Sequence, residues 1–254
     1  MEIVLSILLY TAVGFVAQMI DGALGMAYGV SSNSFLLSVG VSPKVASACV
    51  HLAETFTTGV SGISHWKLGN VDKELFKKLI IPGVLGAVLG AYILTQIDGN
   101  VIKPWISAYL LIMGLVILVK AIRYNGEHKE VTSHISIMGL IGGFFDAIGG
   151  GGWGPIVTTT LVARGKHPRF AIGSVNYSEF FITFSQSIVF IFTLSSELLS
   201  NWTIIAGLLL GGVIAAPFAA ILTRKLPVRL LMGMVGVLII GLSIRTILIS
   251  IGVL

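Results

Sequence analysis

The chain has 254 residues, a mean hydropathy of +0.97 and only 11% charged residues, against about 25% in an ordinary soluble domain. With 55% hydrophobic residues, a water-soluble fold of this size would have too little polar surface to cover its apolar side chains. The composition therefore excludes a soluble enzyme and a disordered chain. The single cysteine, Cys49, excludes an internal disulfide.

The apolar residues gather in ten segments, most of them close to the roughly 20 residues that cross a bilayer as a helix. They are 3–20, 22–40, 43–65, 79–97 and 104–122, then, after a polar linker at 123–133, 134–147, 149–163, 168–194, 202–222 and 228–251. The first segment begins with Met1 and Glu2 rather than with basic residues, so we expect it to belong to the mature fold and not to a signal peptide. The sequence predicts an all-α, multi-pass protein of the cell membrane.

The second half of the sequence repeats the first at an offset of 125 residues. No gap is needed to match the rare acidic residues within the apolar segments. The matched pairs include Asp21 with Asp146, Gly25 with Gly150, Pro43 with Pro168, Glu54 with Glu179 and Thr58 with Thr183. This match predicts two structural repeats, residues 1–125 and 126–254, of about five helical segments each.

The loop charges predict that the two repeats have opposite orientations. Each loop that is basic in one half is poor in Lys and Arg in the other, and cytoplasmic loops collect these residues. Thirteen of the 16 then share the cytoplasmic side: Lys67, Lys73, Lys77, Lys78, Lys120, Arg123, Lys129, Arg164, Lys166, Arg169, Arg224, Lys225 and Arg229. Both termini would face outward, with Lys44 and Lys103. The net charge of +5 thus indicates topology, and we expect no nucleic-acid partner; drift in the loop charges is the alternative explanation.

An inverted repeat requires an odd number of membrane crossings in each half. Five full crossings satisfy this requirement, and so do three crossings plus a re-entrant hairpin made by the first two segments. Segment 134–147 is short for a full crossing, which favours a hairpin or a strongly tilted pair. Charge alone does not separate the two versions.

Four acidic residues lie deep within the apolar segments: Asp21, Glu54, Asp146 and Glu179. A charge at the bilayer centre costs at least about 2.5–3.5 kcal/mol, so these groups should face a cavity, be protonated or be hydrogen-bonded. The two glutamates each belong to a polar stripe at helical spacing. The stripes are Ser47, His51, Glu54, Thr58, Ser61 and His65 in the first half, and Asn176, Glu179, Thr183 and Gln186 in the second. They predict the lining of a pathway, although hydroxyls alone would be explained by contacts between helices.

Glycine-rich turns join the first two segments of each half. The first runs from Gln18 to Gly25 through Asp21 and Gly22, and the second from Phe145 to Gly154 through four consecutive glycines. A helix that starts after such a break directs free N–H groups at the gap, which is an anion-binding arrangement. Each aspartate could instead cap the following helix. The second turn lacks the Lys-Ser/Thr of a phosphate loop, so we do not predict nucleotide binding.

The inverted modules, with their glycine turns, P-[KR] helix starts and mid-helix glutamates, resemble the TauE/SafE sulfite-exporter family of membrane permeases. The resemblance covers essentially the whole chain, and the stretch from Asp146 to Gly154 is its most specific part. Leu24 and Met26 stand where that family more often has glycine. The resemblance implies transport of sulfur-containing anions such as sulfite, thiosulfate or organosulfonates.

We therefore expect a secondary transporter, most simply a proton-coupled exporter working by alternating access, with no enzymatic activity and no cofactor or metal. The expected coupling residues are Glu54, Glu179 and His51. A homodimer is left open. A cation or proton–metal exchanger using the buried carboxylates is the alternative. The expected ligands of the anion are Gln18, Asp21, Gly22, Gly25, Asp146, Gly149, Gly150, Gly151, Gly152, Trp153, Ser174 and Asn176.

Overall fold

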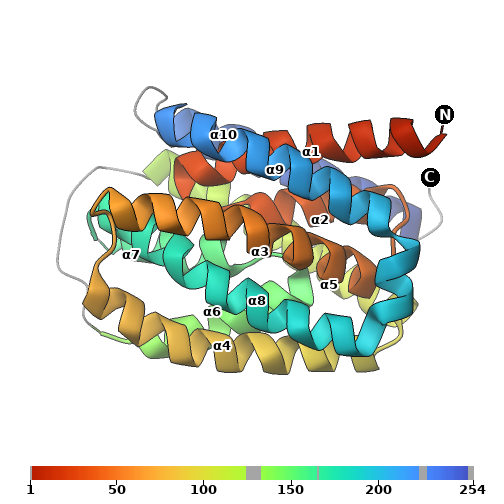
Figure 1. Cartoon of the computed structure of the whole chain (residues 1–254), viewed down its shortest axis with the longest axis horizontal. Coiled ribbons are helices and arrows are strands. Elements are labelled where there is room, and N and C mark those ends of the chain that lie inside the picture. Colours follow the sequence, from red (N-terminus) through yellow and green to blue (C-terminus); the bar gives the residue numbers. More distant parts are fainter. Residues whose placement is uncertain (1, 124–132, 165, 223–227, 251–254) are drawn as a thin grey trace.

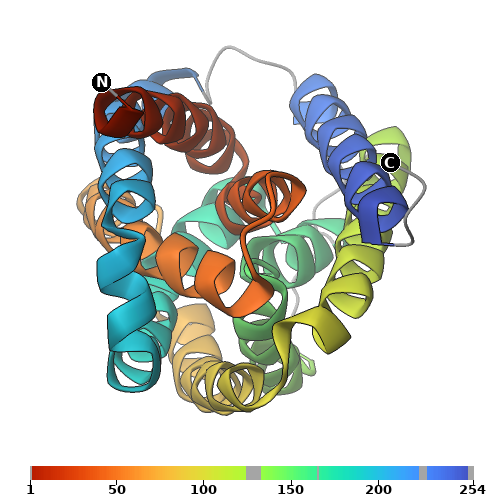
Figure 2. The same cartoon turned by 90° about the vertical axis from the view of Figure 1, so that its right-hand side faces the viewer.

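The computed structural model describes residues 2–123, 133–164, 166–222 and 228–250, and these residues form a bundle of helices (Figures 1 and 2). The first half contributes α1 (Glu2–Leu24), α2 (Tyr28–Ser38), α3 (Pro43–Lys67), α4 (Lys73–Gln96) and α5 (Gly99–Arg123). The second half contributes α6 (Ile135–Gly149), the π-helical turn η1 (Gly154–Thr158), α7 (Thr159–Ala163), α8 (Pro168–Ser200), α9 (Trp202–Leu222) and α10 (Val228–Ser250).

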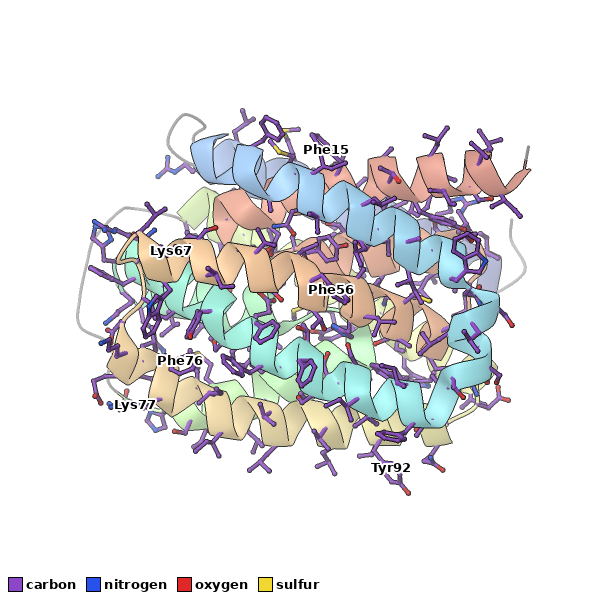
Figure 3. The ribbon with its side chains drawn as sticks, viewed as in Figure 1. Phe15, Phe56, Lys67, Phe76, Lys77 and Tyr92 are labelled. Carbon is purple, nitrogen blue, oxygen red and sulfur yellow. The ribbon has the colours of Figure 1, made fainter. Side chains whose placement is uncertain are left out.

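The predicted all-α membrane fold is confirmed. Within the described ranges, four stretches are long and apolar enough to cross a membrane by length and composition: Ile3–Gly22, Lys73–Gln96, Val101–Arg123 and Arg169–Ser200. Large apolar side chains cover the outside of the bundle; Phe192 is 84% exposed and Trp105 74%. Figure 3 shows Phe15, Phe56 and Tyr92 on this outer surface. So much exposed apolar area is expected of a surface that meets lipid.

Several predicted boundaries differ from the helices observed. The first break comes later than expected, because α1 continues to Leu24 and Gly25 and Ala27 then take left-handed backbone conformations. Segment 79–97 is extended back to Lys73, where Asp72 caps α4 through the amides of Glu74 and Leu75. Segment 149–163 is not one helix, since the break at 150–153 is followed by η1 and α7. Segment 168–194 continues to Ser200, past one residue with non-helical dihedral angles, Leu194.

The first break lies inside the molecule, because Leu24, Met26 and Tyr28 on either side of it are buried. α1 begins at one end of the bundle and α2 returns toward the same end (Figure 1). At that end Arg245 donates to the carbonyl of Ser38, the last residue of α2. The first two segments therefore form a helical hairpin whose turn is buried within the protein. Ile3–Gly22 is long enough for a full crossing, so the number of membrane crossings stays a prediction.

The most extensive helix contacts join one half of the chain to the other. α1 packs along α9, α6 along α4, α3 along α8 and α5 along α10. Three polar pairs join α3 to α8: Thr55 meets Ser187, Thr58 meets Thr183 and Ser61 meets Asn176. As one number rises the other falls, so α3 and α8 run antiparallel.

Basic loops from both halves meet at one end of the bundle, which we call the basic end. Lys67 and Lys77 lie there (Figure 3). Lys166 donates to Asp72 across 2.6 Å, and Arg169 donates to the Oδ1 atom of Asn70 across 2.6 Å. The start of α1 and the end of α10 lie at the other end (Figures 1 and 2). Three of the basic residues assigned to the cytoplasmic side, Lys129, Arg224 and Lys225, lie outside the described residues.

Candidate functional site

The two glycine-rich breaks pack directly against each other in the centre of the protein. A Cβ atom on Gly29 would lie 2.6 Å from the Cα of Gly151, and one on Gly154 would lie 2.5 Å from the Cα of Met26. Real Cβ atoms do not approach other atoms this closely. Glycine is required here because the two backbones touch.

A pair of equivalent hydrogen bonds, one to each break, holds the breaks to the opposite halves of the chain. The Nδ2 atom of Asn33 donates to the carbonyl of Gly149 across 2.6 Å, and the Oγ1 atom of Thr158 donates to the carbonyl of Gly25 across 2.7 Å. Asn33 and Thr158 correspond at the repeat offset. Each bond satisfies a carbonyl beside a helix end that lacks an intrahelical partner. The breaks are thus fixed to each other reciprocally.

Asp146 reaches across the second break from the last turn of α6. Its Oδ1 atom accepts the amides of Gly152 and Trp153 at 2.7 and 2.8 Å, and its Oδ2 atom accepts the Nε2 amide of Gln186 at 2.9 Å. In this conformation the carboxylate occupies the amides that we expected to face an anion. The structure therefore favours the capping role of Asp146 that the sequence left as an alternative.

The glycines of the second break are closed in by protein atoms rather than lining a cavity. The ring and hydroxyl of Tyr109 occupy the places of side chains at Gly149 and Gly152, and Asn33 occupies that at Gly150. The backbone of Gly29 and Val30 blocks Gly151. In the observed conformation these protein atoms occupy the space beside the glycine run where we expected a ligand.

His51 connects the polar stripe of α3 with Asp146. Its Nε2 atom lies 3.0 Å from the backbone carbonyl of Asp146 and its Nδ1 atom 3.0 Å from Oε2 of Glu54. Because a carbonyl only accepts, Nε2 carries a proton and Nδ1 shares a second one with Glu54. The ring of Phe190 stacks on the imidazole at 6.3 Å between centroids. His51 and Glu54 therefore form a fully buried unit that can exchange a proton.

The four acidic residues of the apolar segments all lie in this central region. Asp21, Glu54, Asp146 and Glu179 are at most 3% exposed and close enough to interact electrostatically. The amide of Tyr28 lies beside Asp21, but neither carboxylate oxygen of Asp21 has a partner with hydrogen-bonding geometry. The Oε2 atom of Glu179 also lacks one. A buried carboxylate without hydrogen-bond partners is destabilising. Asp21 and Glu179 therefore differ from Asp146, whose carboxylate oxygens are both hydrogen-bonded.

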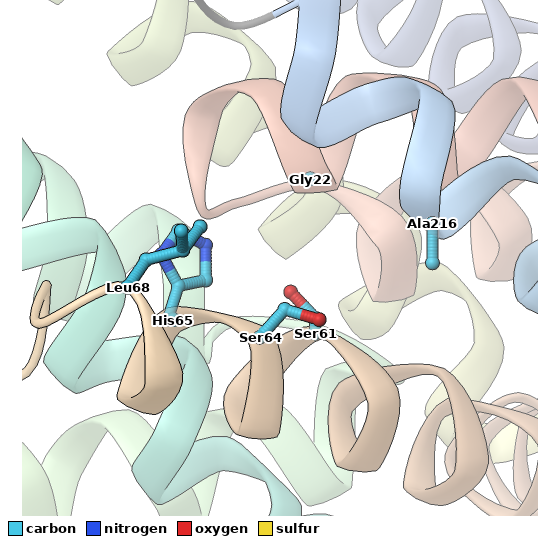
Figure 4. Close-up of a pocket in the computed structure, with 6 residues that line it drawn as sticks. All are labelled: Gly22, Ser61, Ser64, His65, Leu68 and Ala216. Atoms are coloured by element: carbon cyan, nitrogen blue, oxygen red, sulfur yellow. The ribbon is translucent and has the colours of Figure 1, made fainter.

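A small pocket opens beside the first break, between α1, α3 and α9 (Figure 4). The neighbouring Gln18 is fully buried, and neither polar atom of its carboxamide has a hydrogen-bond partner among the residues that the structure describes. The residues that line the pocket are Gly22, Ser61, Ser64, His65, Leu68 and Ala216.

The remaining predicted ligands divide between this region and elsewhere. The Oδ1 atom of Asn176 accepts the hydroxyl of Ser61 at 3.0 Å, and its Nδ2 atom lies 3.2 Å from the position of a Cβ on Gly25. Trp153 is buried in the core, with its indole N–H donating to the carbonyl of Val175. Ser174 does not join the centre, because its hydroxyl accepts the amide of Asp72 at 2.8 Å, next to the basic end.

Sequence reasoning missed the run of buried polar residues in α2. Ser31, Ser32, Asn33 and Ser34 are all buried, and their side chains include several oxygens without partners. Four successive polar residues within an apolar segment were the available signal. Within the described part of the chain, no three His, Cys, Asp or Glu side chains are arranged to hold a metal ion.

Comparisons with known proteins identify one family by its model and several membrane transporters as relatives. The description "Sulfite exporter TauE/SafE" matches residues 10–246. The chain is 45% identical to a probable membrane transporter protein, YtnM, of Bacillus subtilis, over 94% of this chain and 82% of the relative. It is 27% identical to a probable membrane transporter protein of Xylella fastidiosa over 89% of each chain. It is also 26% identical to a sulfite exporter TauE/SafE family protein 3 of Arabidopsis thaliana, over 47% of this chain and 25% of the relative. No solved structure matches.

Proposed function

Since the chain belongs to the sulfite exporter TauE/SafE family and is a multi-pass membrane transporter, we propose that it exports small sulfur-containing anions such as sulfite, thiosulfate or organosulfonates. Transport is secondary, coupled to protons, and proceeds by alternating access. The family description supports sulfite as the substrate, and the resemblance noted from the sequence extends the class to thiosulfate and organosulfonates. The buried acids described above support the coupling to protons.

The meeting of the two breaks is the observation that carries this proposal. Irregular backbone at membrane depth persists only where protein buries it or where it lines a cavity, and here it adjoins unpartnered polar groups. The anion binds at the first break, near Gln18, Gly22, Gly25 and Asn176, rather than at the second break, whose amides Asp146 occupies. The start of α2 contributes a positive dipole end at this place.

Proton coupling resolves a charge conflict within the site. An anion would be repelled by ionised carboxylates nearby, so Glu54 and Glu179 are neutral when it is bound and release protons when it has left. Glu54 exchanges its proton through His51, at 3.0 Å. Burial favours the neutral form of a carboxyl group, which makes such an exchange accessible.

The two halves are inverted repeats in this proposal, with the basic end in the cytoplasm and both termini outside. The antiparallel contact of α3 with α8 supports the inversion, because these helices correspond at the repeat offset. The gathering of Lys67, Lys166 and Arg169 at one end supports the sidedness. Rocking of one repeat against the other would give alternating access.

Flux into proteoliposomes tests the proposal. Sulfite, thiosulfate and an alkylsulfonate are compared with chloride and a divalent cation, with and without a pH gradient. We expect accumulation of a sulfur anion that follows the gradient. Cation flux without anion flux would favour the exchanger that uses the carboxylates as ligands.

The double variant Glu54→Gln, Glu179→Gln tests the coupling. Both substitutions keep the size of the side chain and remove its titration. We expect loss of pH-driven flux while exchange of anion for anion continues. Glu197→Gln, at a half-buried position toward the far end of α8 where the carboxylate accepts the hydroxyl of Ser196, is the matched control. Unchanged pH-driven flux in the double variant would exclude both glutamates as proton carriers.

A further inference from the structure

The pocket of Figure 4 lies in the part of α3 nearest the basic end, because α3 ends at Lys67. Polar groups lead from it toward the central breaks. The hydroxyl of Ser61 donates to Asn176, which adjoins Gly25. The unpartnered Nε2 atom of Gln18 lies 3.5 Å from the place of a Cβ on Gly22. A buried carboxamide without partners, beside a pocket, is a group that a ligand would satisfy.

The hydrogen bonds around His65 define its donor. Arg169 donates to the Oδ1 atom of Asn70 across 2.6 Å, so the NH₂ group of Asn70 faces the Nδ1 atom of His65 at 3.1 Å. An NH₂ group only donates, and Nδ1 therefore accepts. The neutral ring then carries its proton on Nε2, which makes His65 a donor for an anion in the pocket.

The corresponding place in the other half holds an aromatic side chain instead of a histidine. At the repeat offset, Ser64 and His65 correspond to Val189 and Phe190 of α8. Phe190 is fully buried and its ring stacks on His51. Because α3 and α8 run antiparallel, this second place lies toward the opposite end of the bundle. The same position therefore lines a polar pocket at one end and carries a buried aromatic ring at the other.

We propose that the pocket is the mouth through which a small sulfur oxyanion or sulfonate reaches the central site from the basic end, and that Phe190 closes the equivalent mouth at the opposite end. This inference rests on the proposed function. It adds His65, with its Nε2–H donor, as a ligand of the entering anion. It also assigns the observed conformation to the state that is open at the basic end.

Cysteine labelling in sealed membrane vesicles tests the inference. In a Cys49→Ala background, Ser64→Cys and Val189→Cys are exposed to a membrane-impermeant anionic maleimide from either side. Methanesulfonate, which does not react with maleimides, serves as the protecting anion. We expect Ser64→Cys to react from the cytoplasmic side and to be protected. We expect Val189→Cys to react at least about tenfold more slowly, since the minor state of a two-state protein is populated at about 0.1–10%.

Removing the plug provides a second measurement. Phe190→Ala should accelerate labelling of Val189→Cys from the outer side, whereas Phe184→Ala, on an exposed part of the same helix, should not. The comparison of Ser64→Cys with Val189→Cys does not depend on either phenylalanine variant. Equal labelling of the two cysteines, or labelling of Ser64→Cys without protection, would overturn the inference even if the wild-type protein transports sulfonates. If the wild-type protein transports no sulfur anion, the proposed function is wrong, and so is the assignment of such an anion to this pocket.

Discussion

The hydroxyl oxygens of Thr58 and Thr183 lie 3.5 Å apart where α3 crosses α8, and the two residues are equivalent at the repeat offset of 125. If two halves of a protein are related by a two-fold axis, the axis passes between any two equivalent atoms that are in contact. The flanking pairs, Thr55 with Ser187 and Ser61 with Asn176, run in opposite chain directions. The threonine pair therefore marks the point about which our proposal places the inversion of the two halves.

Cross-linking at this point should stop transport. In a Cys49→Ala background, we expect Thr58→Cys and Thr183→Cys to form a disulfide with a membrane-permeant oxidant, because their side chains meet. The bond would tie α3 to α8 and prevent the proposed rocking, and a reductant would restore flux. Electrophoretic mobility and flux are measured on the same sample.

A pair that should not cross-link is the control for this experiment. Phe184 neighbours Thr183 in sequence, but its side chain is exposed on the outside of the bundle. Thr58→Cys combined with Phe184→Cys should stay uncrosslinked and active. Full transport by the oxidised threonine-site variant would contradict motion between these two helices.

Asp146 and Asp21 are equivalent in sequence but should differ in their effect on stability. Asp146→Ala removes the acceptor of two buried amides and of Gln186. Leaving buried groups unpaired costs about 1–3 kcal/mol each. The carboxylate oxygens of Asp21 have no hydrogen-bonded partner, so we expect Asp21→Ala to be neutral or stabilising. Thermal unfolding in detergent checks this, and a larger loss for Asp21→Ala would be the opposite of our expectation.

The membrane class, the apolar segments and the two glycine-rich breaks could be predicted because each leaves a strong local signal. The two aspartates, the glycine runs and the stripe around Glu54 stand out against an apolar background, and the repeat match connects them. The number of membrane crossings made by α1 and α2 could not be predicted, because the loop charges are the same for both versions.

The state of each group in the site could not be predicted, because it depends on contacts between distant segments. Nothing local to Ser174 indicates that Asp72, about a hundred residues away, engages its hydroxyl. Likewise, the second glycine run is filled by Tyr109 and Asn33 of the first half. The residue types suited to binding an anion could be read from the sequence. Only the structure shows which of these residues are already hydrogen-bonded within the protein.

Gly151 should be among the glycines least tolerant of substitution. Its φ of +145° is a conformation that side chains rarely adopt, and a Cβ there would collide with the backbone of Gly29 and Val30. Gly151→Ala should cost about 1–3 kcal/mol in backbone strain, with a similar further cost of overpacking. Gly241→Ala, a helical position with no atom within 4 Å of the new Cβ, should be neutral. Comparable folded yields and unfolding temperatures for the two variants would show that the breaks can separate at little cost.

The ion pair of Asp72 with Lys166 should make stability depend on pH at the basic end. Partial burial alone would raise the pKa of Asp72, but Lys166 at 2.6 Å and the amides of Leu75 and Glu74 together hold it below the ordinary value of 3.8. The pKa is then lower in the folded than in the unfolded protein. The carboxylate therefore stabilises the fold above pH 3.8, and this contribution is lost as the pH falls through the lower folded value.

Asp72→Asn should lower the unfolding temperature near neutral pH by roughly 2–4 °C, the equivalent of about 1 kcal/mol in a chain of this length. The difference from wild type should shrink as the pH falls from 3.8 through the lower folded pKa of Asp72, because below that folded pKa both proteins carry a neutral side chain at this position. Glu74→Gln is the matched control, since the Glu74–Lys77 pair is exposed and 3.4 Å long, and exposed pairs contribute little. The unfolding temperatures of wild type, Asp72→Asn and Glu74→Gln are measured across this pH range. If the difference between wild type and Asp72→Asn persists unchanged at low pH, the effect of the substitution comes from the geometry of the helix cap and not from charge.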